Sequence, residues 1–127
     1  MGKWMDGHLG RLQNFQQEIL QGGGEERIAV QHSLGKLTAR ERIDRLADPG
    51  SFEELGSLVR NTYSRRMAEP RPDAADGVVM GLAQINGRQV MVYSLDFTVM
   101  SGALGDQGTW KIAELIQMAG MELLPII

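Results

Sequence analysis

The residues with the clearest chemical potential lie in one glycine-bearing loop, residues 94–111, with glycines at 102, 105 and 108. Glycines let backbone N–H groups approach a carbonyl or a phosphate closely, and the N-terminus of a following helix favours negative charge. Lys111, one of three lysines, stands in the first turn of that predicted helix. We therefore predict a ligand site here, although Lys111 can equally be a solvated surface lysine. Asp96, at the start of the loop, fits an Asx cap better than a ligand contact.

The rest of the 127 residues offers few side chains that could act as nucleophiles or bind a metal. There is no cysteine, which excludes a disulfide scaffold, a thiol nucleophile and a thiolate metal site. The two histidines, His8 and His32, are far apart in the sequence and form no ligand or triad pattern. We predict no metal site and no catalytic side chain.

Charge points to an anionic partner of modest size. The net charge is −3, but residues 27–71 carry nine basic and six acidic side chains, while the flanking segments are acidic. A nucleic-acid-binding domain is usually strongly basic, so a phosphorylated small molecule fits this local excess better. The alternative is a solvated helix face with internal ion pairs.

The N-terminal third is predicted to be helical. Apolar residues recur at three- and four-residue steps over residues 3–21, which predicts an amphipathic helix ended by glycines 22–24. Residues 25–32 can form a second, short helix. No apolar run is long enough for a transmembrane helix or resembles a secretory signal, so we expect no membrane partner and a cytoplasmic protein.

A third helix is predicted from a capping box. Thr38 and Glu41 have the spacing at which each side chain bonds the other residue's backbone N–H. We expect the helix to bury Ile43 and Leu46 and to stop at residues 48–50.

The C-terminal half predicts a hairpin, a helix and another strand. Residues 78–85 and 88–95 are β-prone, apolar on both faces, and separated by Asn-Gly, a strong hairpin signal. Residues 109–120 follow as a helix, and residues 123–127 begin a strand parallel to the second hairpin strand. The residues expected to pack that helix are Trp110, Ala113, Ile116 and Met118 or Ala119. Residues 52–59 fit a short strand or a helical turn, and residues 60–77 form a polar loop.

Several motifs, in order along the chain, resemble one enzyme family. They are Gly35-Lys-Leu-Thr-Ala-Arg-Glu-Arg-Ile43, Asp48-Pro-Gly-Ser-Phe-Glu-Glu54, Asp76-Gly-Val-Val79, Ile85-Asn-Gly-Arg88, Asp96-Phe-Thr-Val99 and Gly102-Ala-Leu-Gly105. Together they resemble the N-terminal part of the carboxyltransferase (β) subunits of biotin-dependent acyl-CoA carboxylases, such as propionyl-CoA carboxylase β chains. The resemblance covers residues 9–127.

The resemblance implies an α/β fold of the crotonase (ClpP) type, with a spiral of strand-strand-helix units. It divides the chain into a helical arm (1–50), a short element and loop (51–77), and the first unit (78–127), leaving the spiral incomplete. It implies acyl-CoA as substrate, carboxybiotin on a carrier protein or biotin carboxylase subunit as partner, and a homo-oligomer. An enolate held by backbone N–H groups replaces side-chain catalysis, and no metal is required. The candidate CoA contacts are Lys36, Arg40, Arg42, Gly102, Ala103, Leu104, Gly105 and Lys111.

The sequence also departs from the family pattern. Ser101 stands where family members often have glycine, and Trp110 replaces an acidic or small residue. The family's Asp-Ser-Gly-Gly-Ala-Arg stretch, which supplies the acyl-CoA oxyanion donors, would follow Ile127. We therefore expect an N-terminal piece of a carboxyltransferase subunit that is inactive alone. The alternative is a non-catalytic module that docks on a partner carboxylase subunit.

Overall fold

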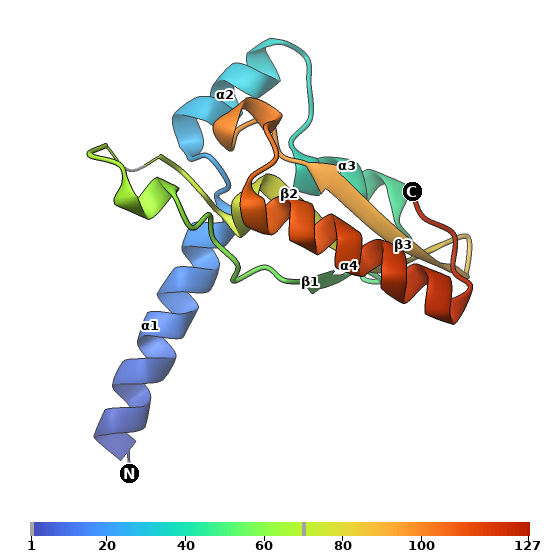
Figure 1. The fold of residues 1–127 in the computed structure, drawn as a ribbon, viewed down its shortest axis with the longest axis horizontal. Coiled ribbons are helices and arrows are strands. Elements are labelled where there is room, and N and C mark those ends of the chain that lie inside the picture. Colours follow the sequence, from blue (N-terminus) through green and yellow to red (C-terminus); the bar gives the residue numbers. More distant parts are fainter. Residues whose placement is uncertain (1, 70) are drawn as a thin grey trace.

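The computed structural model describes residues 2–69 and 71–127, and it places four helices and three strands in that part of the chain (Figure 1). In chain order these are α1 (Gly2–Leu20), α2 (Glu25–Ser33), α3 (Ala39–Leu46), β1 (Glu53–Leu55), β2 (Val78–Ile85), β3 (Arg88–Leu95) and α4 (Asp106–Glu122). Three short 3-10 turns interrupt the loops, at Ser64–Arg66, Ala75–Gly77 and Met100–Gly102.

The β2–β3 hairpin is the centre of the fold. The sheet has the order β1-β2-β3, and both pairings are antiparallel. Successive residues of a strand point to opposite faces, so Val79 and Ala83 pack with Ile43 of α3, whereas Val78 and Met80 pack with Leu115 and Ala119 of α4. The prediction that both faces of the hairpin are covered is confirmed, and the Asn-Gly turn sits where it was expected.

The three N-terminal helices also form as predicted, with one error in packing. Thr38 caps α3, its hydroxyl accepting from the Glu41 N–H while the Glu41 carboxylate accepts from the Thr38 N–H. Ile43 is 1% exposed, but Leu46 remains 41% exposed. The prediction that Leu46 is buried was wrong because the face of α3 that packs on the sheet carries Ala39, Ile43 and Ala47, and Leu46 lies outside it.

Helix α4 begins three residues earlier than predicted and buries a different face. Its buried residues are Gly108, Lys111, Leu115 and Ala119, which follow the three- and four-residue spacing of one helix face. Trp110 and Ile116 were expected to pack but are 54% and 51% exposed, and Ala113 is exposed as well. The prediction was therefore wrong for Trp110, Ala113 and Ile116, which lie off the buried face, whereas Ala119, named with Met118 as a packing residue, is buried.

The last residues pair with β3 in the predicted parallel direction. The Met91 N–H donates to the Pro125 carbonyl over 2.9 Å, and the Ile127 N–H donates to the Met91 carbonyl over 2.9 Å. The crossover through α4 therefore returns the chain alongside β3.

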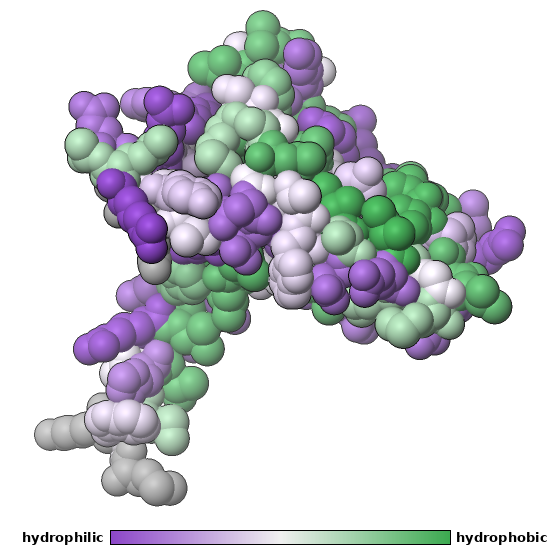
Figure 2. Space-filling model, in the orientation of Figure 1, coloured by the Kyte–Doolittle hydropathy of each residue, from purple (hydrophilic) through white to green (hydrophobic). Residues whose placement is uncertain are grey.

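Helix α1 extends away from the rest of the molecule (Figure 1). Its C-terminal end is anchored by Ile19, which is 2% exposed, but Met5, Leu9 and Leu12 are 42–50% exposed. Figure 2 shows apolar residues along one side of this helix. None of the helices in the described part of the chain is long and apolar enough to cross a membrane.

A buried carboxylate joins α4 to the start of β2. Asp76 is fully buried, and its two oxygens accept from the Asn61 Nδ2 over 2.9 Å and from the Gly108 backbone N–H over 2.6 Å. Gly108 lies in the first turn of α4, so Asp76 caps this helix from a distant part of the chain. Gly105 lets the carboxylate approach, because a Cβ there would overlap both Asp76 oxygens and the Asn61 amide.

This packing predicts that alanine substitutions at two glycines have opposite effects on stability. Gly105 precedes α4, and Gly120 lies within it. Gly105→Ala should lower the free energy of unfolding by about 3 kcal/mol, because the new methyl group displaces a buried charge. Gly120→Ala should raise it by about 0.5–1 kcal/mol, because nothing lies within 4 Å of its Cβ position and alanine favours helix. Urea denaturation measures both, and equal effects at the two positions would contradict the proposed role of Asp76.

Candidate functional site

The β3–α4 loop, residues 96–105, is bordered by two surface pockets, and a third lies close by. The pocket of about 380 Å³ between the loop and α2 is lined by Arg27, Val30, Gln31, Leu34, Arg71, Phe97, Thr98, Met100 and Ser101, and we call it the arginine pocket. A second, of about 400 Å³, is lined chiefly by Asn61, Tyr63, Met67, Arg71, Met100, Leu104 and Gly105, and we call it the loop pocket. Arg71 lines both.

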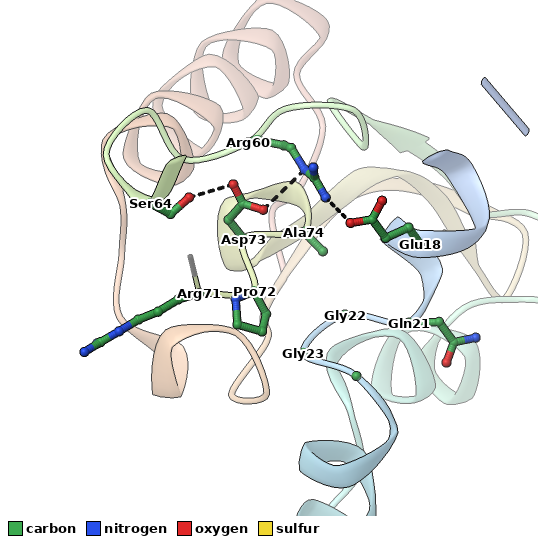
Figure 3. Close-up of a pocket in the computed structure, with 11 residues that line it drawn as sticks. Glu18, Gln21, Gly22, Gly23, Arg60, Ser64, Arg71, Pro72, Asp73 and Ala74 are labelled. Carbon is green, nitrogen blue, oxygen red and sulfur yellow. Dashed lines mark hydrogen bonds and ion pairs between the residues drawn. The ribbon is translucent and has the colours of Figure 1, made fainter. Parts of the chain in front are cut away.

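The third pocket, of about 390 Å³, lies where α1 meets residues 60–74 (Figure 3). Arg60 dominates it and is already paired. Its guanidinium contacts Glu18 over 2.6 Å and Asp73 over 3.2 Å, and it stacks 4.7 Å from the centre of the Phe15 ring. Because two carboxylates already pair with Arg60, we interpret this pocket as a joint between α1 and the body of the molecule. Figure 3 shows that Arg71 extends away from this cluster.

The arginine pocket has a different electrostatic character. Its described lining includes two arginines and no acidic side chain. Arg27 donates to the Thr98 backbone carbonyl over 3.3 Å, which holds its guanidinium beside the loop. The Phe97 ring is 53% exposed, and the Lys36 ammonium lies 5.9 Å from its centre. Two arginines and one accessible aromatic ring therefore line the same pocket, and a lysine lies against that ring.

Helix α2 is held against the loop by the glycine run before it. The Gly23 N–H donates to the Thr98 hydroxyl over 2.9 Å, and a Cβ on Gly23 would overlap the Thr98 backbone. Thr98 in turn donates its hydroxyl to Asp96 over 2.7 Å. The Asp96 carboxylate also accepts from the Thr98 N–H over 3.0 Å, which is the Asx turn that the sequence favoured over a ligand contact.

The loop itself turns through unusual backbone conformations. Met100, Ser101 and Gly102 have φ of 47°, 55° and 75°, in the left-handed region. A non-glycine residue pays about 1–2 kcal/mol for this conformation. Met100 and Ser101 line the arginine pocket, so the strain is located at the site.

The three basic residues that the sequence offered as CoA contacts lie in different surroundings in the structure. Lys36 is exposed, and its ammonium lies 5.9 Å from the centre of the Phe97 ring, which lines the arginine pocket. Arg40 forms a bidentate pair with Glu54, at 2.5 and 3.0 Å, in which both side chains are less than one-fifth exposed. Arg42 is exposed and donates to the Leu37 carbonyl over 3.4 Å. Lys36 alone of these three lies beside the loop residues.

The four loop candidates stay together, but Lys111 does not join them. Ala103, Leu104 and Gly105 line the loop pocket, and Gly102 packs near the Phe97 ring. Lys111 is fully buried, and its ammonium donates to the backbone carbonyls of Ala75, over 3.0 Å, and Val78. Both sequence interpretations placed Lys111 on the surface, and both are corrected here: it supports the turn that carries Asp76.

Burial lowers the pKa of Lys111 to about 8, from 10.5. Loss of hydration is the main cause, and Arg40 adds to it, whereas Glu54 and Asp76 act in the opposite direction. Among the described residues there is no group of three His, Asp or Glu side chains that could hold a metal ion.

Sequence reasoning missed the residues that define the arginine pocket, namely Arg27, Arg71 and Phe97. The excess of basic residues over 27–71 included both arginines, but nothing local marked them as neighbours. They come together because α2 and residues 71–73 pack on either side of the same loop.

Helices on both faces of a sheet, with a crossover returning the chain beside β3, define this protein as a partial crotonase-type α/β fold. Solved structures similar to this chain include transcarboxylase 12S with methylmalonyl-coenzyme A bound, at a TM-score of 0.87 and 40% identity, covering 96% of this chain and 24% of that one. Another is a single-chain, multi-domain long-chain acyl-CoA carboxylase, at a TM-score of 0.85 and 33% identity over 94% of this chain.

Residues 30–127 match the carboxyl transferase domain model, and the chain belongs to this family. It is 46% identical over 120 residues to the propionyl-CoA carboxylase beta chain of Cereibacter sphaeroides, covering 94% of this chain and 23% of that one. It is 40% identical over 123 residues to the methylmalonyl-CoA carboxyltransferase 12S subunit of Propionibacterium freudenreichii, covering 97% and 24%. The chain thus spans about a quarter of the length of these relatives.

The buried Lys111 predicts a distinctive pH dependence. Between pH 8 and 10.5 the unfolded chain keeps a proton on this lysine that the folded chain has lost. The free energy of unfolding should therefore rise with pH across this window, by at most about 1.4 kcal/mol per pH unit. Urea denaturation at several pH values measures the slope. Lys111→Met should remove this contribution and Lys36→Met should retain it; equal slopes in the two variants would contradict the assignment.

The left-handed turn predicts that Ser101→Gly stabilises the chain. Glycine removes the Cβ penalty at φ 55° but loses more entropy on folding, so the net gain should be about 1 kcal/mol. Ser101→Ala keeps a Cβ and separates the loss of the hydroxyl from the relief of strain. Thermal denaturation compares them, and an alanine variant as stable as the glycine variant would refute the backbone explanation.

Proposed function

We propose that this chain forms part of an acyl-CoA carboxyltransferase that moves a carboxyl group between carboxybiotin and an acyl-CoA. The observation that carries the proposal is the β3–α4 loop, where a left-handed turn borders a cationic pocket in a domain of the carboxyl transferase family. Relatives named for propionyl-CoA and methylmalonyl-CoA support the substrate class. The biotin would arrive on a carrier protein or biotin carboxylase subunit, and the assembled enzyme would be a homo-oligomer.

Within that enzyme this chain would bind and orient the substrate. Residues 102–105 line the loop pocket or pack beside it, and their backbone would lie along the thioester arm. Lys36, whose ammonium lies beside the Phe97 ring, would contact the phosphates. Carboxybiotin supplies the carboxyl group, and the enolate charge would be stabilised by backbone N–H groups. The enolate would thus require no nucleophilic side chain from this chain.

A second function is favoured by one observation, the apolar side of α1. Met5, Leu9 and Leu12 are exposed on a helix that extends from the body. Contiguous exposed apolar residues mark interaction surfaces. In this alternative the chain is a non-catalytic module that docks on a partner carboxylase subunit.

A chimera tests the first proposal. This chain replaces the matching segment of the Propionibacterium 12S subunit, to which it is 40% identical over 123 residues. We expect the chimera to retain carboxyl transfer from methylmalonyl-CoA with kcat/KM within about tenfold of the parent, a barrier change near 1.4 kcal/mol. The matched control carries Gly105→Ala in the same segment.

A chimera that folds and assembles like the parent, yet transfers no carboxyl group, would contradict the catalytic proposal and favour the docking module. Sedimentation and circular dichroism establish assembly and folding before activity is compared. The Gly105→Ala control should lose activity together with thermal stability.

A further inference from the structure

We propose that the outer half of helix α1 pairs with α1 of a second copy of this chain, the two helices running in the same direction as a short coiled coil. The proposal rests on the homo-oligomer of the proposed function and names one contact within it. The seam of this pair follows alternating three- and four-residue steps along the helix, at Met5, His8, Leu12, Phe15 and Ile19.

The spacing of this seam is the first argument. Alternating steps of three and four residues keep side chains on one face of a helix, and such a face packs best against another helix. Ile19, at the inner end of the seam, is 2% exposed, so its own chain already covers it. Leu12 and Met5, farther out, are 42% and 43% exposed, on the part of α1 that extends from the body (Figures 1 and 2). The outer half of the seam is therefore shaped for a helical partner.

The residues beside the seam are the second argument. In a same-direction pair, a residue on one flank meets the residue five positions later on the other helix. Trp4 then meets Leu9 of the second copy, and these two apolar side chains are 70% and 50% exposed. The Trp4 ring also lies 4.2 Å from the His8 ring, centre to centre, so flank and seam form one surface. By the same rule Arg11 meets Gln16, and no two like charges oppose each other.

Charge favours this direction over the reverse. Two helices that run in opposite directions join like flanks, so each residue beside the seam faces its own counterpart's side. In the register that pairs Leu12 with His8 of the second copy, the two Arg11 side chains would lie close together on one flank. Their repulsion opposes that arrangement. The same-direction pair avoids it.

The composition of α1 is the third argument. Gly7 and Gly10 lie on the side of the helix away from the seam, where they lower the intrinsic helix propensity. A projecting helix of this composition depends on packing of its apolar side, and a second α1 would supply that packing to both copies. Two heptads should bury less than the ~800 Å² per partner of a standard interface. Isolated chains should therefore pair weakly, and the pair gains strength where other contacts hold the copies together.

Sedimentation equilibrium of the 127-residue chain tests the inference. We expect a concentration-dependent dimer, which Leu12→Asp should weaken by roughly tenfold or more because it places a charge in the seam. His8→Leu should strengthen the dimer by roughly tenfold, since leucine replaces a polar residue at a seam position. The matched control is Asn14→Asp, which adds the same charge on the opposite side of the helix and should pair as the parent chain does. Circular dichroism of each variant checks folding.

Disulfide cross-linking tests the direction of the pair, because the chain has no cysteine of its own. In a same-direction pair Met5 faces Met5 and Leu12 faces Leu12, so Met5→Cys and Leu12→Cys should each form covalent dimers under mild oxidation. Asn14→Cys, on the other side of the helix, should not. A mixture of the Met5→Cys and Leu12→Cys chains that links position 5 to position 12 would overturn the same-direction pair.

Other occupants of the apolar side give different results. A chain that stays monomeric up to about 1 mM overturns the inference, whether or not its α1 binds a purified biotin carboxylase subunit or phosphatidylcholine vesicles. So does a dimer that is unchanged in both Leu12→Asp and His8→Leu. The two proposals fail separately: an active chimera with a monomeric chain leaves carboxyl transfer standing, and an inactive chimera with a dimer sensitive to Leu12→Asp supports the α1 pair alone.

Discussion

The Asp76 carboxylate is the constraint on which the rest of this structure depends. A fully buried charge is costly unless hydrogen-bond donors replace water, and here Asn61 and the Gly108 N–H do so. The same residue sits at φ 48°, beside Ala75 at φ 51°, so the turn that carries it is strained. Lys111 bonds the Ala75 carbonyl, and the Asp96 N–H donates to the Gly77 carbonyl over 2.8 Å, which holds the turn from two further sides. Helix α4, strand β2 and the β3–α4 loop are thereby fixed to one another.

This buried connection supports a second, exposed turn, Met100–Gly102, whose backbone is also strained. The turn at Met100–Gly102 repeats the left-handed geometry of Ala75–Gly77, and Val99, just before it, packs on Gly77. The inner turn is locked by side-chain bonds, whereas the outer turn faces the pockets with its backbone accessible. This arrangement suits a binding loop. The inner turn is fixed by its hydrogen bonds, and the outer turn keeps its shape because it rests on the inner one.

The sequence predicted the parts of the fold whose signals are local. The capping box of α3, the Asn-Gly hairpin and the glycine run after α1 each act through neighbours within a few residues, and each is found where it was expected. Lys111 could not be placed this way, because its burial depends on carbonyls more than 30 residues distant. The same applies to Arg27 and Arg71, which meet only after α2 folds back onto the loop. Arg40 has the positive charge that a phosphate contact requires, but it is already paired with Glu54 on β1.

The central claim of the proposed function is that the β3–α4 loop and the pockets beside it contact acyl-CoA. The most direct test is a CoA titration of the isotopically labelled chain, followed by the backbone amide signals in nuclear magnetic resonance spectra. The account predicts that the largest shifts fall on residues 97–105, Arg27 and Arg71, while the β2–β3 turn stays unchanged. Saturable shifts confined to α1 or to the β2–β3 turn, with the loop silent, would contradict it.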